Sequence, residues 1–417
     1  TRSTAMFPLA RPIRRTLLTL LASSLAVVAA QAQEPAPTPT PAPEKPYRQF
    51  GWLQAGFAAN FASPEDRINF GVNFNWRSND YRLNQLCFVL ENPLEHKNRF
   101  NLGYRVDFLV GHDAPFFAAN GLFDRFTGLD STSGVGLEGP SSFRNVNRIG
   151  IDLPQFYVEF SLPRFISARG IDVRIGKFYT LMGREVYPAP DTDFYSRTYE
   201  NIVGTPFTHT GVLATVHATE TLDLVAGVVE GWDVFKDNNG RPSYQAGLIW
   251  NSPDKRFNWT TVGINGPEQV DNDRNDRTLI TSYLTVKLGA GDKWLLSTGG
   301  HVGHEENAVS DPVTGVPGDA EWYAYSAHLF YTVDPRLRLG FRAEWFRDDD
   351  GARTALLKRP GFAASFYDLT LGVTYSLRES LRVRPEVRLD WTPDARPFND
   401  QADKSQLTAA FDVVWEF

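Results

Sequence analysis

The chain has 417 residues, of which 49 are acidic and 42 are Lys or Arg, so its formal net charge is −7. An acidic chain lacks the basic surface that neutralises phosphates, and this excludes nucleic acid as an expected partner. The single cysteine, Cys87, excludes an internal disulfide, and we expect it to be a buried apolar side chain.

The first 32 residues predict a cleaved export signal. Met6 is the expected start, which leaves residues 1–5 upstream, and a basic stretch precedes the apolar residues 16–30. This apolar stretch is shorter than the roughly 20 residues that span a bilayer. Small side chains just before Gln33 predict cleavage there. Because residues 1–32 hold four arginines and no acid, the mature chain would carry −7 − 4 = −11.

Residues 33–49 follow as a proline-rich spacer. Between Glu34 and Pro46 proline stands at nearly every second position, which removes the N–H donors that helices and sheets need. We expect a passive, extended periplasmic tether. The alternative is a proline-rich ligand for a binding partner.

Beyond residue 50 the sequence alternates between apolar and polar side chains, most clearly over residues 100–110, 337–345 and 381–391. Side chains at i and i+2 share a face only in a strand, so these segments are predicted to be β-strands. No apolar run in this part is long enough for a membrane-spanning helix, and the mean hydropathy of the chain is −0.31. A bilayer requires every backbone polar group to be paired, which leaves a closed barrel as the expected membrane architecture.

The connections between the predicted strands are alternately short, as at 218–221, 334–336 and 378–380, and long, as at 111–152 and 180–207. This rhythm is typical of an outer-membrane barrel with short periplasmic turns and long external loops. We therefore predict an all-β fold over residues 50–417, a transmembrane antiparallel up-and-down β-barrel of about 16 strands. The predicted strands are 50–61, 83–90, 99–110, 153–162, 171–179, 208–217, 222–230, 243–250, 257–264, 278–288, 294–303, 322–333, 337–346, 366–377, 381–391 and 405–417.

Residues 68–76 also alternate. Counting them alone as a strand would put one terminus on the wrong side of the membrane, so we assign them to the first loop. Barrels of roughly fourteen or eighteen strands are the alternatives.

The last predicted strand ends on an aromatic residue. Apolar side chains alternate from Leu407 to Phe417, a form associated with insertion by the barrel-assembly machinery. Trp415 and Phe417 are also expected in the periplasmic aromatic girdle. Both interpretations predict the bacterial outer membrane, with its lipid and lipopolysaccharide as partners.

Five motifs stand out along the chain: Leu83-Asn84-Gln85-Leu86, Gly176-Lys177-Phe178, Gly183-Arg184-Glu185, Asp193-Phe194-Tyr195-Ser196-Arg197-Thr198-Tyr199 and Pro206-Phe207-Thr208-His209-Thr210-Gly211-Val212. They resemble motifs of one known family, the OmpL-like β-barrel porins, and the resemblance covers nearly the whole mature chain. More distantly the chain is similar to the phosphate-selective porins O and P. The resemblance implies a pore and names no solute. Arg184 departs from the family pattern, in which an aromatic or small residue is common, so a different local pore lining is expected there.

The polar faces of the predicted strands are expected to line the interior. A charge facing lipid at the bilayer midplane would cost roughly 2 to 4 kcal/mol, so the strand arginines belong inside. Two interpretations stay open: a salt-bridged lining that holds the barrel open, or a transverse field that favours dipolar or anionic solutes. The predicted pore-lining residues are Arg105, Asp107, Glu159, Arg174, Arg338, Arg342, Glu344, Arg382, Arg384, Glu386, Arg388 and Asp390.

Two loops, 111–152 and 180–207, are long enough to fold inward. We expect the second to be the constriction element, and the alternative is an external loop that packs against its neighbours. Its candidate residues are Glu185, Asp193, Tyr195 and Arg197.

No motif predicts catalysis, a metal site or a cofactor. The chain has no Gly-x-Ser-x-Gly elbow, and His209 and His217 have the even spacing of a lumenal lining. His301, His304 and Glu305 lack the helical spacing of a zinc motif.

With the resemblance, the sequence predicts a porin for passive diffusion of small hydrophilic solutes, with a mild anion preference. One alternative is a plugged barrel that acts as an adhesin or structural scaffold. Another is a lipase or protease built into the barrel wall. A homotrimer is the assembly to consider first, because porins usually form trimers.

Overall fold

The computed structural model describes residues 48–94, 100–122, 149–310, 314–357 and 361–417. The expected signal peptide, residues 1–32, lies outside the described residues, and so does all of the expected tether before Arg48. Within the described ranges no helix is long and apolar enough to cross a membrane.

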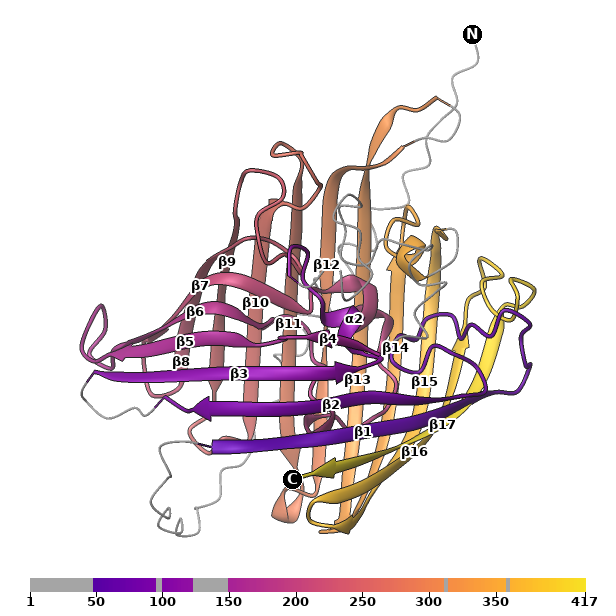
Figure 1. Cartoon of the computed structure of the whole chain (residues 1–417), viewed down its shortest axis with the longest axis horizontal. Coiled ribbons are helices and arrows are strands. Elements are labelled where there is room, and N and C mark those ends of the chain that lie inside the picture. The colour runs from indigo at the N-terminus through magenta and orange to yellow at the C-terminus, as the bar shows by residue number, and fades with distance from the viewer. Residues whose placement is uncertain (1–47, 95–99, 123–148, 311–313, 358–360) are drawn as a thin grey trace. The chain divides into compact units, whose positions relative to one another are not determined.

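Seventeen strands occupy the sixteen positions in the wall of a closed antiparallel barrel (Figure 1). Apart from β4, each strand pairs with the next one along the wall, and β1 also pairs with β17, which closes the sheet. Two short strands, β4 and β5, both pair with β3 and share one position in the wall. The strands are β1 (Arg48–Asn60), β2 (Asp80–Asn92), β3 (Asn101–Gly111), β4 (Gly150–Asp152), β5 (Phe156–Leu162), β6 (Ile171–Tyr179), β7 (Thr208–His217), β8 (Leu222–Val229), β9 (Ser243–Asn251), β10 (Phe257–Pro267), β11 (Asp276–Leu288), β12 (Trp294–Ser310), β13 (Pro317–Asp334), β14 (Leu337–Asp348), β15 (Ala364–Arg378), β16 (Leu381–Trp391) and β17 (Ser405–Glu416).

The predicted fold is confirmed, because every predicted strand overlaps an observed one and the wall has sixteen positions rather than fourteen or eighteen. The interruption between β4 and β5 has a local cause. Pro154 has no N–H to donate to the ladder, and the strand stops at residues 153–155.

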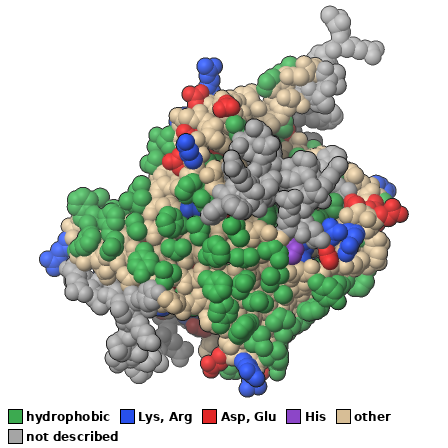
Figure 2. All heavy atoms as spheres, viewed as in Figure 1, with side chains coloured by type: hydrophobic (Ala, Val, Ile, Leu, Met, Phe, Trp, Pro, Cys, Tyr) green, Lys and Arg blue, Asp and Glu red, His purple; other side chains and the backbone are tan. Residues whose placement is uncertain are grey.

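The strand register sorts side chains in the way that the alternation predicts. Phe341, Leu371 and Val387 are direct cross-strand neighbours on β14, β15 and β16, and all three are exposed on the outer face. Arg342 on β14 and Arg384 on β16 lie on the opposite, inward face of their strands and are at most 1% exposed. Figure 2 shows hydrophobic side chains spread over the part of the outer wall that β1, β2 and β3 form. The outer face is thus apolar, as lipid requires, and the charges lie inside.

Residues 68–76 belong to the first loop, between β1 and β2, as expected. One bridge pairs Ile68 with Arg77, and the loop packs against the inner side of the barrel. Phe70 is fully buried, and its ring centroid lies 5.7 Å from that of Phe366 on β15. The alternation here therefore reflects packing inside the barrel.

Short helical turns interrupt the connections. They are α2 (Ala114–Phe117), the 3-10 turns η1 (Ala189–Asp191), η3 (Ala290–Asp292) and η4 (Thr354–Leu357), and the π-turn η2 (Glu200–Gly204). All four residues of α2 are buried, so this described part of the loop 111–152 packs into the interior. Residues 123–148 of that loop lie outside the described residues.

Candidate pore and its inner segment

Residues 180–207, between β6 and β7, enter the barrel, and we call them the inner segment. Two contacts show how far it reaches. Arg342 Nη1 on β14 donates to Ser196 O at 2.9 Å, and Tyr195 Oη donates to Asn84 Oδ1 on β2 at 2.8 Å. The inner segment therefore contacts wall strands from both ends of the sequence.

Two wall carboxylates bind backbone N–H groups of the inner segment. An irregular segment inside a barrel cannot pair its N–H groups in a sheet, and a buried N–H without a partner is costly. Each carboxylate accepts from two consecutive residues, which fixes the path of the chain at that point. The contacts are Glu386 with Tyr195 N and Ser196 N at 2.9 and 3.0 Å, and Glu344 with Tyr199 N and Glu200 N at 2.7 Å each.

Three buried wall arginines bind carbonyl groups of the inner segment. Each guanidinium also meets a carboxylate of the wall, so its charge is balanced and its donors are used on both sides. These arginines connect the wall to the inner segment. Arg342 binds Ser196 O and Asp368 at 2.9 and 3.0 Å, Arg384 binds Thr192 O and Asp412 at 2.6 and 2.9 Å, and Arg388 binds Arg197 O and, at 2.9 Å, Asp390.

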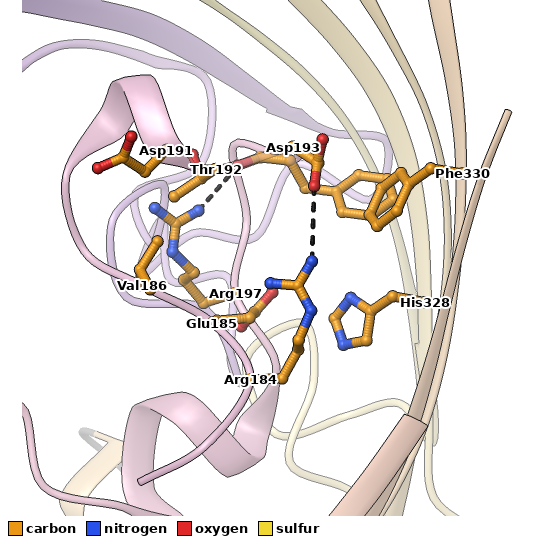
Figure 3. Close-up of a pocket in the computed structure, with 10 residues that line it drawn as sticks. Arg184, Glu185, Val186, Asp191, Thr192, Asp193, Arg197, His328 and Phe330 are labelled. Atoms are coloured by element: carbon orange, nitrogen blue, oxygen red, sulfur yellow. Dashed lines mark hydrogen bonds and ion pairs between the residues drawn. The ribbon is translucent and has the colours of Figure 1, made fainter. Parts of the chain in front are cut away.

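The candidate acids of the inner segment pair with arginines. Glu185 lies 3.1 Å from Arg342, and Asp193 lies 3.1 Å from Arg338 and 3.8 Å from Arg184. Figure 3 shows the Arg184 side chain directed at Asp193, beside the imidazole ring of His328 on the wall strand β13. The Asp193 carboxylate therefore pairs with the guanidinium groups of both Arg184 and Arg338.

The other two candidates, Tyr195 and Arg197, are buried within the inner segment. Arg197 Nη1 donates to Phe194 O at 2.8 Å, and its guanidinium lies 5.2 Å from the centroid of the Phe74 ring. Burial lowers the pKa of the Arg197 guanidinium. Both residues thus hold the segment together, and neither presents its polar group to open water.

Glycines in the wall make room for the inner segment. Gly340 on β14 and Gly372 on β15 are direct cross-strand neighbours, and the ring of Phe194 lies over both. A Cβ at either position would lie 2.8 Å from that ring. The close approach therefore requires glycine at both positions.

An apolar cluster, which we call the septum, connects the inner segment to opposite parts of the wall. Met182, Tyr199, Ile202 and Val203 of the inner segment are buried in it. Their partners include inward-facing side chains of β7–β11 on one side and of β13–β15 on the other. The wall residues are Leu213, Val225, Val229, Val262, Ile264 and Leu279 on the first side, and Trp322, Phe346 and Phe366 on the second.

A cavity of about 470 Å³, which we call the vestibule, lies between the inner segment and the ends of β12–β16 near the 334–336 turn. Arg338 and Arg382, two predicted pore-lining residues, line it together with Asp193. The other lining residues are Arg184, Pro190, Asp191, Thr192, Leu295, Thr332, Asp334, Pro335, Arg336, Leu337, Thr374 and Ser376.

Four other predicted pore-lining charges form a separate group on β3, β5 and β6. Arg105 pairs with Asp107 at 2.7 Å, and Arg174 pairs with Glu159 at 2.8 Å. Arg342, Glu344, Arg384, Glu386, Arg388 and Asp390 instead lie buried beneath the inner segment. A part in lining the pore stays a prediction for all twelve residues.

Some residues that hold this arrangement together were missed by the sequence interpretation. Asp368 and Asp412 occupy inward positions of β15 and β17, so the alternation that identified the arginines also marks them. Trp322 Nε1, which donates to Gly204 O at 3.1 Å, and Arg353 Nε, which donates to Val203 O, carry no such signal.

Two histidines of β7, His209 and His217, are hydrogen-bonded within the fold. His209 binds Gly231 O at 2.9 Å and Thr180 Oγ1 at 3.0 Å, while His217 binds Asp223 and Asp172 at 2.8 and 3.0 Å. Within the described ranges, no three His, Cys, Asp or Glu side chains gather as metal ligands would. Cys87 is buried, as expected.

Solved structures with the same fold are outer-membrane proteins. The channel DcaP of Acinetobacter baumannii aligns with 89% of this chain and 97% of its own, with a TM-score of 0.55 and 10% identity. An anion-selective porin of Comamonas acidovorans aligns with 89% of this chain and 99% of its own, with a TM-score of 0.54 and 10% identity. OmpT of Vibrio cholerae aligns with 89% of this chain and 97% of its own, with a TM-score of 0.52 and 10% identity. At this identity the likeness shows the fold. No protein of curated function matches the sequence.

A family model described as "Putative beta-barrel porin-2, OmpL-like" matches residues 47–417. This match covers the whole wall, from β1 to β17, and the inner segment. It confirms the resemblance carried by the sequence motifs. The chain belongs to the OmpL-like β-barrel porins, and it is a channel of the bacterial outer membrane through which solutes diffuse passively.

Proposed function

We propose that the inner segment is the constriction element of this porin, and that the channel passes small hydrophilic solutes with a mild preference for anions. One observation carries the proposal: three arginines and two carboxylates of the wall bind the backbone of the inner segment. A segment held at so many points stays inside the barrel and narrows the lumen.

The anion preference is supported by unequal exposure within the accessible ion pairs. The side chain of Arg105 is 20% exposed and that of Asp107 is fully buried. Arg174 and Arg338 are 30% and 32% exposed, more than their partners Glu159 and Asp193 at 14% and 19%. Among the pairs of the predicted pore-lining arginines, that of Arg382 and Glu416 is the exception, at 22% and 38%. A solute therefore meets guanidinium groups more often than carboxylates, and exposed charges concentrate counter-ions.

This assigns different roles to the arginines of the predicted stripe. Arg338 and Arg382 both line the vestibule, and Arg338, the more exposed of the two, acts on solutes. Arg342, Arg384 and Arg388 are buried and act on the inner segment, because their donors are bound to its carbonyl groups.

Reversal potentials in planar bilayers under a KCl gradient test the proposal. We expect steady channels with a potential displaced toward that of chloride. The variants Arg174→Gln and Arg338→Gln should each move it toward zero, because each removes one accessible positive charge. Arg169→Gln is the matched control, because Arg169 lies in the exposed turn before β6 and pairs with the exposed Glu220. Cation selectivity that neither variant changes would contradict the proposal.

The septum favours a second function, a plugged barrel that serves as an adhesin or scaffold, because its apolar side chains connect opposite parts of the wall. The same recordings separate the two functions. A plugged scaffold shows no steady channels, whereas the porin does.

We infer that the barrel has no lipase or protease activity. His209 is fully buried, and its ring nitrogens lie against Gly231 O and Thr180 Oγ1 inside the fold, so a substrate does not reach it as it would a general base. Hydrolysis assays in detergent test this inference. Activity that disappears in His209→Ala would overturn it.

We also propose lipid and lipopolysaccharide as partners of the outer face, the barrel-assembly machinery as the partner of Phe417, and a homotrimer as the assembly. Exposed apolar side chains on β14–β17 support the first. OmpT of Vibrio cholerae has been solved in a trimer form, to which this chain is similar with a TM-score of 0.52 and 10% identity. Native mass spectrometry in detergent would show three copies, and a single copy would contradict the trimer.

A further inference from the structure

The vestibule carries a positive pole. Arg184 and Arg338 both line it, and both pair with the single carboxylate of Asp193, at 3.8 and 3.1 Å. Two guanidiniums therefore share one carboxylate. Arg338 is also 32% exposed, so a second carboxylate can reach it.

The vestibule also carries a negative pole on another part of its lining. Asp191, at the end of η1, faces the cavity and forms no ion pair within the described residues. Burial raises the pKa of its carboxyl. The charges of Arg105 and Arg382 lower this pKa from a distance, but neither forms an ion pair with Asp191. A carboxylate that is partly desolvated and in no ion pair favours a cation as a guest.

Other charges of the lining are already used. The Asp334 carboxylate accepts from Arg336 N and Leu337 N at 2.7 and 3.0 Å, which closes the turn before β14. Arg382 is bound to Pro190 O and Glu416. The charges left for a solute are thus the surplus at Arg184 and Arg338, the exposed guanidinium of Arg336 and the carboxylate of Asp191.

A simple anion or a simple cation would satisfy one pole and meet the other unfavourably, whereas a molecule with both charges satisfies both. A volume of about 470 Å³ is in the range of small-molecule sites and accommodates an amino acid. Hydroxyl groups of Thr332, Thr374 and Ser376 line the same cavity and add neutral hydrogen-bonding groups.

We propose that the vestibule is a binding subsite for zwitterionic solutes of amino-acid size. The carboxylate of the solute lies against Arg338 and Arg184, and its ammonium group lies against Asp191. This proposal names a solute class for the channel and rests on the proposed function, since it places the subsite on the diffusion route.

Three related probes test it: alanine, propionate and ethylamine. Propionate lacks the ammonium group of alanine, and ethylamine lacks the carboxylate. In single-channel recordings, we expect alanine on the vestibule side to reduce the KCl current at concentrations about ten-fold lower than either of the others, because a second charge-assisted contact adds about 1.4 kcal/mol or more.

Two variants separate the poles. Asp191→Asn should remove the preference for alanine over propionate, and Arg338→Gln should remove its preference over ethylamine. The controls are Glu220→Gln and Arg169→Gln, because these two residues form an exposed pair in turns away from the vestibule. In both control variants, the three probes should reduce the KCl current as they do in the unmodified protein.

The outcomes distinguish this proposal from the proposed function. Steady channels that alanine and propionate block equally would show an ordinary anion site and overturn the zwitterion proposal. Steady channels that no probe blocks would overturn the subsite and leave the porin. If no channels appear, the proposed function fails, and saturation-transfer NMR of alanine with the full chain in detergent decides the subsite: a signal lost in Asp191→Asn supports it, and no signal overturns it.

Discussion

Glu268 follows β10 and is a buried carboxylate without a cation in direct contact among the described residues. Its oxygens accept from Trp232 N at 2.8 Å and from Ser243 Oγ at 2.7 Å. Burial raises the pKa of the Glu268 carboxyl to about 7, although the charge of Arg277 acts in the opposite direction. The folded barrel therefore holds this proton more tightly than the unfolded chain does.

This difference makes stability depend on pH. The contribution of a carboxyl with a raised pKa is complete below its unfolded value of 4.5 and is lost as the pH rises through about 7. We expect the urea midpoint of the barrel in detergent to fall between about pH 5 and pH 8, with a cost of roughly 3 kcal/mol from this group.

The variant Glu268→Gln keeps the shape of the protonated group and should flatten the profile. Asp113 and Asp233, whose pKa burial raises to about 6, act in the same direction, so part of the slope should remain. Glu220→Gln, at an exposed turn, is the control. Parallel profiles for Glu268→Gln and the unmodified chain would show that another group titrates.

The septum is the element-scale feature that most affects transport. A water-filled lumen calls for polar inward residues, yet Val225, Val229 and Val262 face inward and pack with Ile202 and Val203 of η2. Apolar constrictions can stop conduction by excluding water. The packing of η2 against β7–β11 is therefore expected to limit the current.

Val203→Thr tests this, because threonine has nearly the size of valine and adds one hydroxyl. We expect a loss of about 1 to 3 kcal/mol in the free energy of unfolding, since the hydroxyl enters an apolar site. We also expect a higher single-channel conductance, because the hydroxyl admits water. Val186→Thr is the control, as Val186 lies in the same inner segment and is 41% exposed. Lower stability with unchanged conductance would show that the septum has a structural role alone.

The sequence predicts the wall elements much better than the inner segment. Period-two alternation is a local property, so β14 and β16 were identified together with the inward face that carries Arg342 and Arg384. On β8 both faces are apolar, because Leu224 and Val228 face outward while Val225 and Val229 face inward. Alternation cannot reveal an apolar inner face of that kind.

The site was predictable in part for the same reason. The length and the family motifs of the loop 180–207 predict an inward-folding element, but its contacts with Glu344 and Glu386 join residues more than 140 positions apart. Such contacts depend on the path of the chain through the barrel. The arginines were therefore assigned to the correct face, while their burial beneath the inner segment was not foreseen.

At the scale of the whole molecule, the outer face has to match the depth of the bilayer. Leu371, in the middle of β15, is 64% exposed and lies between Phe341 and Val387 of the neighbouring strands. Leu377 lies on the same face of the same strand, next to the turn at residues 378–380, and is 51% exposed. The two leucines differ mainly in their distance from the strand end.

The cost of a charge on the lipid side depends on depth, because water and headgroups are within reach only near the interfaces. Leu371→Arg should therefore destabilise the barrel in phospholipid vesicles by roughly 2 to 4 kcal/mol, and Leu377→Arg by about 0 to 1 kcal/mol. Guanidinium titrations of both variants in the same vesicles measure the difference. Equal costs would mean that the two positions lie at the same depth in the bilayer. They would contradict the arrangement in which the turn at residues 378–380 lies at the periplasmic edge of the membrane.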